Sequence, residues 1–85
     1  MTEDELIALG SDAEVLLSSS AFTQTVNSLV DNTFQTFSNS PPDKPDERET
    51  AHSSYRALVD IVNTLRQRVS VRDEIIAKNE SKTEE

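Results

Sequence analysis

Apolar side chains recur at alternating spacings of four and three residues through the second half of the chain. A period of 3.5 residues held for almost four heptads is typical of one long helix with a single apolar seam. The chain has few other apolar residues with which to cover that seam, so we expect it to need a partner surface. The seam consists of Ala51, Tyr55, Leu58, Val62, Leu65, Val69, Arg72 and Ile76.

Length and composition limit the core that this chain can build. Its 85 residues form one small domain at most, and only 34% of them are hydrophobic, against about 45–50% in typical globular domains. The sequence has no cysteine, so neither a disulfide nor a thiolate–metal site can stabilise it. Stability is therefore expected from helix packing, together with oligomerisation or docking.

Capping residues and prolines divide the chain into helices. Ser11 and Glu14 have capping-box spacing, and the serines at 18–20 favour a break between two helices. Three prolines then stop the second helix, and Asp46 is placed to cap the last one. The expected elements are an acidic arm over 1–10, helices over about 11–18, 20–38 and 47–78, a Pro-rich turn over 39–46, and a disordered tail over 79–85.

Gly10 is the single glycine of the chain, and its position suits a helix stop or a hinge. Thr2 and Glu5 have the spacing of another capping box, so residues 1–10 fit either a short helix that ends at Gly10 or a frayed arm. The sequence does not separate these two alternatives.

The fold class that follows is all-α, an αα-hairpin whose last helix is much longer than its partner. The 20–38 helix can cover only the first half of the 47–78 helix, so an apolar end should remain uncovered. We therefore expect a coiled-coil-like oligomer or a chain docked on a larger protein. The predicted uncovered residues are Val69, Val71, Ile75 and Ile76, and the predicted partner-binding residues are Leu58, Val62, Leu65, Val69, Arg72 and Ile76.

The net charge of −8 lies entirely in the first half of the chain. Residues 1–50 carry ten acids and two bases, whereas residues 51–85 carry six of each. Such a front half repels phosphates, which disfavours sequence-independent DNA binding and fits a basic protein partner or simple solubility. The acidic N-terminus is unlike a signal peptide, and no apolar run approaches 18 residues, so an intracellular protein without a membrane partner is expected.

Residues that could carry chemistry are few. One glycine excludes a glycine-rich phosphate loop, and the absence of cysteine with a single histidine, His52, argues against a zinc site. We therefore predict no catalytic residue, no cofactor, no metal and no small-molecule substrate. His52 is interpreted as a surface residue, and the acids Asp43, Asp46, Glu47 and Glu49 as helix-capping residues.

Arg66, Arg68 and Arg72 form the one basic cluster. They fit ion pairs with nearby acids or a neighbouring chain, and they also fit contacts with phosphates. The aromatic residues Phe22, Phe34, Phe37 and Tyr55 fall at helical spacing among aliphatic residues, so we interpret them as core residues rather than as a base-stacking surface.

Residues 46–58 resemble a group of small helical-hairpin proteins encoded near the head and packaging genes of tailed bacteriophages. The shared pattern is Asp46-Glu47-Arg48-Glu49, then Tyr55-Arg56-Ala57-Leu58, with His52 where the group commonly has tryptophan. The likeness covers roughly residues 13–69. Its upstream part matches Ala13, Leu16, Leu17, Ser19, Ser20 and Phe22.

The resemblance implies a role in virion assembly or structure, with the chain in the virion or the host cytoplasm. We therefore expect a non-enzymatic assembly protein that binds copies of itself or a larger capsid, portal or packaging protein. Two alternatives stay open. One is an acidic inhibitor that occupies a basic groove of a host enzyme, and the other is a packaging factor that contacts DNA through its arginines.

Overall fold

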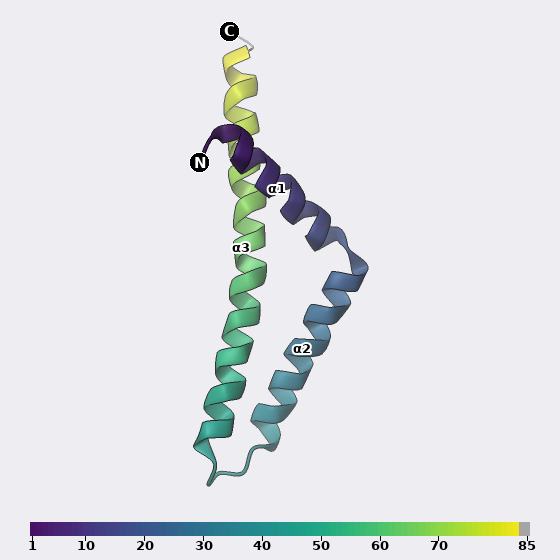
Figure 1. Ribbon diagram of the computed structural model, residues 1–85, viewed down its shortest axis with the longest axis vertical. Coiled ribbons are helices and arrows are strands. Elements are labelled where there is room, and N and C mark those ends of the chain that lie inside the picture. Colours follow the sequence, from purple (N-terminus) through teal and green to yellow (C-terminus); the bar gives the residue numbers. More distant parts are fainter. Residues whose placement is uncertain (84–85) are drawn as a thin grey trace.

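A computed structural model describes residues 1–83, which form three helices without a strand. They are α1 (Glu3–Ser18), α2 (Ser20–Asn39) and α3 (Pro45–Thr83). The long helix α3 lies beside both others: α1 packs along its C-terminal half and α2 returns to its N-terminal half (Figure 1). The prediction of an all-α hairpin with a long last helix is confirmed.

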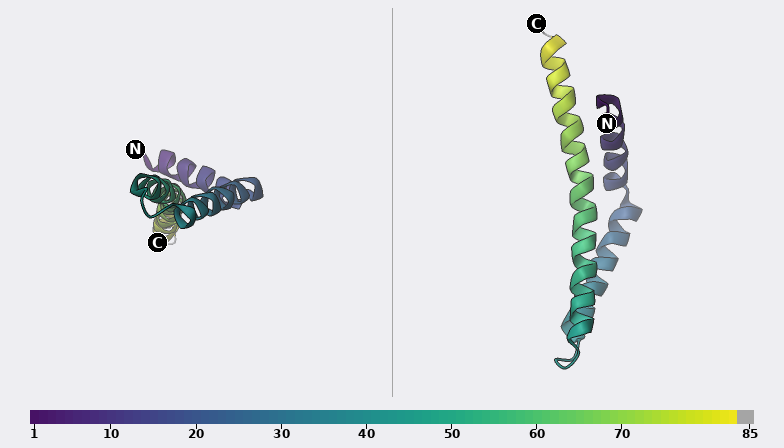
Figure 2. Two further views of the ribbon diagram at one scale, coloured as in Figure 1. Left: turned by 90° about the horizontal axis from the view of Figure 1, so that it is seen from below. Right: turned by 60° about the vertical axis from the view of Figure 1, so that its left-hand side comes forward.

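A single residue, Ser19, separates α1 from α2. Its backbone is extended, with φ −74° and ψ 121°. Its N–H donates to the carbonyl of Leu16 at 3.1 Å and ends α1, while its Oγ accepts from the N–H of Phe22 at 3.3 Å and begins α2. The corner that it makes stands away from α3, so the three helices outline a thin triangle (Figures 1 and 2).

The expectation of an acidic arm over residues 1–10 is wrong, because α1 begins at Glu3 and runs unbroken through Gly10. Thr2 caps it: the Thr2 Oγ1 accepts from the Glu5 N–H at 3.1 Å. Gly10 is neither a stop nor a hinge. A Cβ atom placed there would collide with Arg72 Cβ and lie 2.7 Å from the Arg68 carbonyl oxygen. Glycine is therefore needed for the close approach of α1 to α3.

Polar contacts continue this α1–α3 contact along both helices. Arg72 Nη2 donates to Glu14 Oε2 at 2.7 Å, and the same guanidinium also binds Asp73. At the other end of α1, Glu3 lies 3.9 Å from Lys78 Nζ and accepts a long hydrogen bond of 3.5 Å from Asn79. We call the contacts of α1 with α3, centred on Gly10, the clasp.

The last helix is longer than expected at both ends. It begins at Pro45, a residue suited to the first helical turn, so the connection shortens to residues 40–44. It also continues through Thr83, so the expected disordered tail is helical from residue 79 to residue 83. The first residue of this segment, Asn79, contacts Glu3 at the N-terminus of α1. Residues 84 and 85 of that expected tail lie outside the described residues.

The expectation that the apolar end of α3 is uncovered is mostly wrong, because the clasp covers it. Leu65 is buried, and Val69, Val71 and Ile75 are half-buried, while Ile76 is 37% exposed. The covering element is α1, which is twice as long as the helix expected over 11–18 and folds back along α3. The apolar end of the long helix is thus largely covered within one chain.

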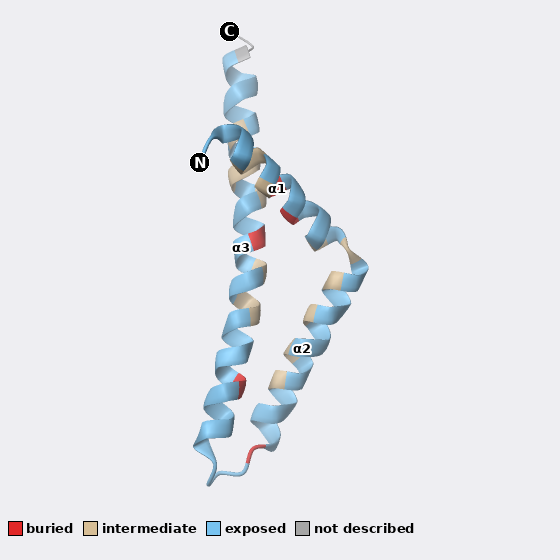
Figure 3. Cartoon of the chain, in the orientation of Figure 1, coloured by how far each residue is buried: buried red, intermediate tan, exposed pale blue. Residues whose placement is uncertain are grey.

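Little of the molecule is buried. Among the described residues the buried apolar side chains are Ala13, Ala51 and Leu65, and most of each helix surface is exposed (Figure 3). The chain measures 65 × 23 × 17 Å with a radius of gyration of 18.2 Å, where a compact chain of this length has about 12 Å. Its accessible surface is 6377 Å², about 1,300 Å² above that of a compact protein of its mass.

Replacement of Gly10 by alanine is predicted to destabilise the fold. Alanine favours a helix over glycine by about 1 kcal/mol, but overpacking costs about 1–3 kcal/mol, and the Arg68 backbone cannot move aside easily. We expect the free energy of unfolding to fall by up to about 2 kcal/mol in thermal unfolding followed by circular dichroism. The exposed neighbour Ser11→Ala is the control and should be neutral or slightly stabilising. Equal stabilisation by both changes would contradict the close approach.

A charge swap tests the polar part of the clasp. Glu14→Arg and Arg72→Glu each place like charges together, so each should lower the unfolding midpoint. The double variant should recover part of the loss, because an acid at position 72 still lies beside Asp73. The recovery should shrink in about 1 M salt, where the Debye length is about 3 Å. Asp73→Asn removes only the adjacent partner of Arg72 and serves as the control. Additive losses in the double variant would show that the two side chains do not interact.

Candidate functional site

The predicted partner-binding seam of α3 is used mostly within the chain. Leu65 is buried, Leu58, Val62 and Val69 are half-buried, and the Arg72 side chain is only 12% exposed. Because α3 contacts only α1 and α2 here, these two helices are what cover the seam. Ile76 is the most exposed apolar member of the set, so the structure leaves a different surface open for a partner.

That surface belongs to α2, which has no buried residue although it contains seven apolar side chains. It carries one charge, Asp31, in 20 residues. Its threonines, serines and asparagines are weak helix formers, and hydroxyls bond back to the helix, as Thr25 Oγ1 does to the Ala21 carbonyl at 2.8 Å. A helix of low propensity with a single charged residue needs packing to persist, and α3 supplies that packing on one side only.

Three aromatic side chains gather where α2 meets the start of α3. Phe34 is 68% exposed, Phe37 44% and Tyr55 45%. They line one shallow hollow of about 300 Å³ together with Thr33, Ala51 and His52. The guanidinium of Arg48 stands 5.4 Å from the centre of the Phe37 ring, a cation–π distance. We call Phe34, Phe37 and Tyr55 the aromatic patch.

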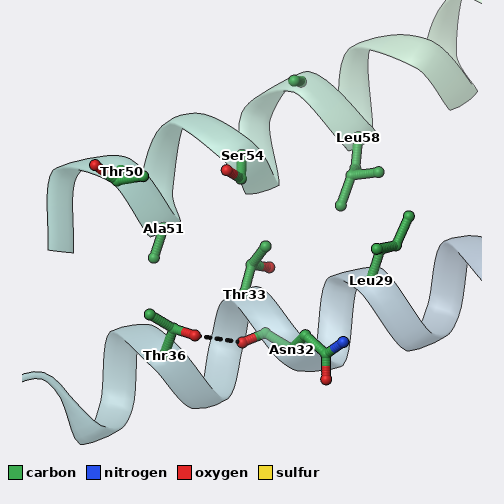
Figure 4. A pocket seen from close by; sticks show the side chains of 9 residues that line it. Leu29, Asn32, Thr33, Thr36, Thr50, Ala51, Ser54 and Leu58 are labelled. Atoms are coloured by element: carbon green, nitrogen blue, oxygen red, sulfur yellow. Dashed lines mark hydrogen bonds between the residues drawn. The ribbon is translucent and has the colours of Figure 1, made fainter. Parts of the chain in front are cut away.

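The opposite side of the α2–α3 pair holds an open groove of about 470 Å³ (Figure 4). Leu29 and Leu58 point toward each other across it, and Leu29 is 45% exposed. The remaining lining is small, so the two helices cannot interdigitate large side chains here. Those small residues are Asn32, Thr33, Thr36, Thr50, Ala51, Ser54 and Ala57.

Sequence reasoning treated the aromatic residues as core and so missed the patch. Of the four aromatics, Phe22 is half-buried, and the other three are at least 44% exposed. Their helical spacing is the same whether a helix is covered on one side or on two. The one sequence feature that separates the cases is the scarcity of charge over residues 20–39, which is unusual for a surface helix.

The arginine cluster is divided by the fold. Hydrogen bonds to Glu14 and then to Asp73 raise the pKa of Arg72 above its ordinary value. The charged form of Arg72 is therefore favoured in the folded chain and stabilises it. This stabilisation would be lost only as the pH rises through the raised pKa, above the range in which proteins are handled. Arg66 and Arg68 remain exposed, but Arg72 is held by the clasp, so the structure does not present three free arginines as one group.

The described residues hold no group of three or more histidine, cysteine or acidic side chains arranged to bind a metal ion. His52 is exposed and lies at the edge of the aromatic patch. Of the four acids interpreted as capping residues, Asp46 and Glu47 lie in the first turn of α3, where the helix dipole favours them. The expectation that Asp46 is the N-cap is wrong, because the helix already begins at Pro45. Over residues 1–83, no helix has the length and hydropathy needed to cross a membrane.

Comparisons of the chain with protein-family models, with curated proteins and with solved structures found no match. The exposed apolar surface of α2 and its border with α3 is the feature on which a functional proposal can rest.

Proposed function

We propose that this chain is a non-enzymatic assembly protein that acts by helix–helix association through the α2 side of its hairpin. The observation that carries the proposal is the exposure of Phe34, Phe37 and Leu29 on a helix with one charge. Aromatic residues are enriched at the centres of protein interfaces, and charged residues are depleted there.

Energetics support a partner on this surface. Burying a leucine or phenylalanine side chain contributes about 1.5–3 kcal/mol, and several such side chains are left open here. Formation of α2 also costs backbone conformational entropy, and packing on one side offsets this cost poorly. A partner that covers the patch would stabilise both the complex and α2 itself.

The resemblance of residues 13–69 to small proteins of tailed bacteriophages suggests the process in which this association takes place. Under the proposal, the chain contributes to virion assembly by joining copies of itself or a larger capsid, portal or packaging protein. The mechanism is the burial of apolar surface, and no side chain acts chemically.

The acidic face of α1 supports a second candidate function. This helix carries five acids and no base, and Asp4, Glu5 and Asp12 are exposed without a role in the clasp. Such a face suits an inhibitor that occupies a basic groove of another protein. Affinity that falls steeply with salt would favour this candidate, whereas association through the patch would hold or tighten.

Hydrogen exchange of the backbone amides tests the association function. In the dilute isolated chain, we expect amides of α2 to exchange much faster than those of α1 and of α3 at the clasp, because α2 has no buried residue. Protection of α2 should rise when its partner surface is supplied. High protection of α2, equal to that of the clasp and independent of chain concentration, would contradict the proposal.

A further inference from the structure

We infer that the partner on the aromatic patch is a second copy of this chain, joined through a two-fold contact between the two α2–α3 hairpin ends. This inference rests on the proposed association function and names its partner. Three observations carry it: the size of the uncovered surface, the charges around the patch and the charges of the other helices.

The surface that the chain leaves open matches what a dimer requires. Its accessible area exceeds that of a compact protein of the same mass by about 1,300 Å². A stable interface of standard size takes about 800 Å² from each partner. One second copy is therefore enough to use most of the excess, which reflects the elongated shape of 65 Å by 23 Å.

Charges of both signs lie beside the patch, as a self-complementary contact needs. Arg48 and Glu49 line a second hollow that adjoins the patch at Phe37, and the Arg48 guanidinium stands over the Phe37 ring. Asp31 lies one helical turn before Phe34. The apolar centre is thus bordered by acidic and basic side chains. Across a two-fold axis each residue meets the complementary position of its copy, so a border of both signs can pair with itself.

The other helices direct a second copy to this end of the molecule. α1 has five acids and no base, so two copies would repel each other through α1. The clasp meets α3 at Arg68 and Arg72, and the 13 residues of helix from Tyr55 to Arg68 span about 20 Å. That separation is more than twice the Debye length of about 8 Å at physiological salt, so repulsion from the clasp is weak at the patch.

The chain supplies its own probe of the contact. Tyr55 is the single tyrosine, and there is no tryptophan, so intrinsic fluorescence comes from the patch. We expect light scattering to show a mass of twice 9.5 kDa at high concentration, with dissociation on dilution. Quenching of Tyr55 by acrylamide should increase over the same dilution range, because the side chain is 45% exposed in the single chain.

A pair of lysine variants tests the position of the contact. Phe34→Lys should weaken self-association at least about 30-fold, the factor expected when an interface anchor is lost. Val15→Lys is the matched control on α1: Val15 is 72% exposed, and the change in charge is the same. Both variants lower the net negative charge, so loss of the dimer in Phe34→Lys cannot come from added general repulsion. Both should keep the helix content of the parent.

Three results would overturn the inference: a monomer at all concentrations up to the solubility limit, a dimer equally sensitive to both lysine variants, or a dimer whose formation leaves Tyr55 quenching unchanged.

Hydrogen exchange then distinguishes failure of the dimer from failure of the proposed association function. A monomer with fast exchange in α2 would remove the second copy but keep the association function, with a different protein as partner. A monomer with α2 as protected as the clasp would remove both.

Discussion

The close approach of α1 to α3 at Gly10 is the contact on which the rest of the structure depends. With no side chain at this position, the two helices come near enough for Glu14 to reach Arg72 and for Glu3 to reach the region of Lys78 and Asn79. The same contact covers Leu65 and shields its neighbours farther along α3. A chain with so few buried residues relies on this one well-fitted contact more than a protein with a large core would.

The clasp also decides which surface is left for function. Because α1 covers the C-terminal half of α3, the apolar seam is mostly satisfied within the chain. α2 receives cover from one side only, and its Phe34 and Phe37 side chains are exposed next to Tyr55. The surface that we propose for association therefore lies at the hairpin end, far from the acidic helix, and not along the end of the long helix where the heptad pattern predicted it.

The sequence predicts the parts of this fold that depend on local rules. The heptad period indicates α3, Pro41 and Pro42 indicate the turn, and the serines at 18–20 indicate the break that Ser19 makes. Long-range contacts are beyond such rules. A glycine that ends a helix and a glycine that admits a neighbouring helix look the same in sequence, so Gly10 was misread, and the length of α1 with it.

The end of α3 shows the same limit. Residues 79–83 are polar, which favours disorder, yet they continue α3, and the first of them, Asn79, donates a hydrogen bond to Glu3. The partners lie 76 residues apart in sequence, and no local pattern announces their contact. The aromatic patch was missed for a related reason, because the spacing of Phe34 and Phe37 identifies a helix face without telling what lies opposite.

Ser19 has a mechanical consequence for the patch. As the only residue between two helices, it sets the direction of α2 through its own torsion angles. α2 is about 30 Å long, so a rotation of about 10° at Ser19 displaces its far end by about 5 Å. The short connection over residues 40–44 links that far end to the start of α3 and so limits the displacement. The distance of Phe34 and Phe37 from Tyr55 therefore depends on the torsion angles of Ser19, some five helical turns away.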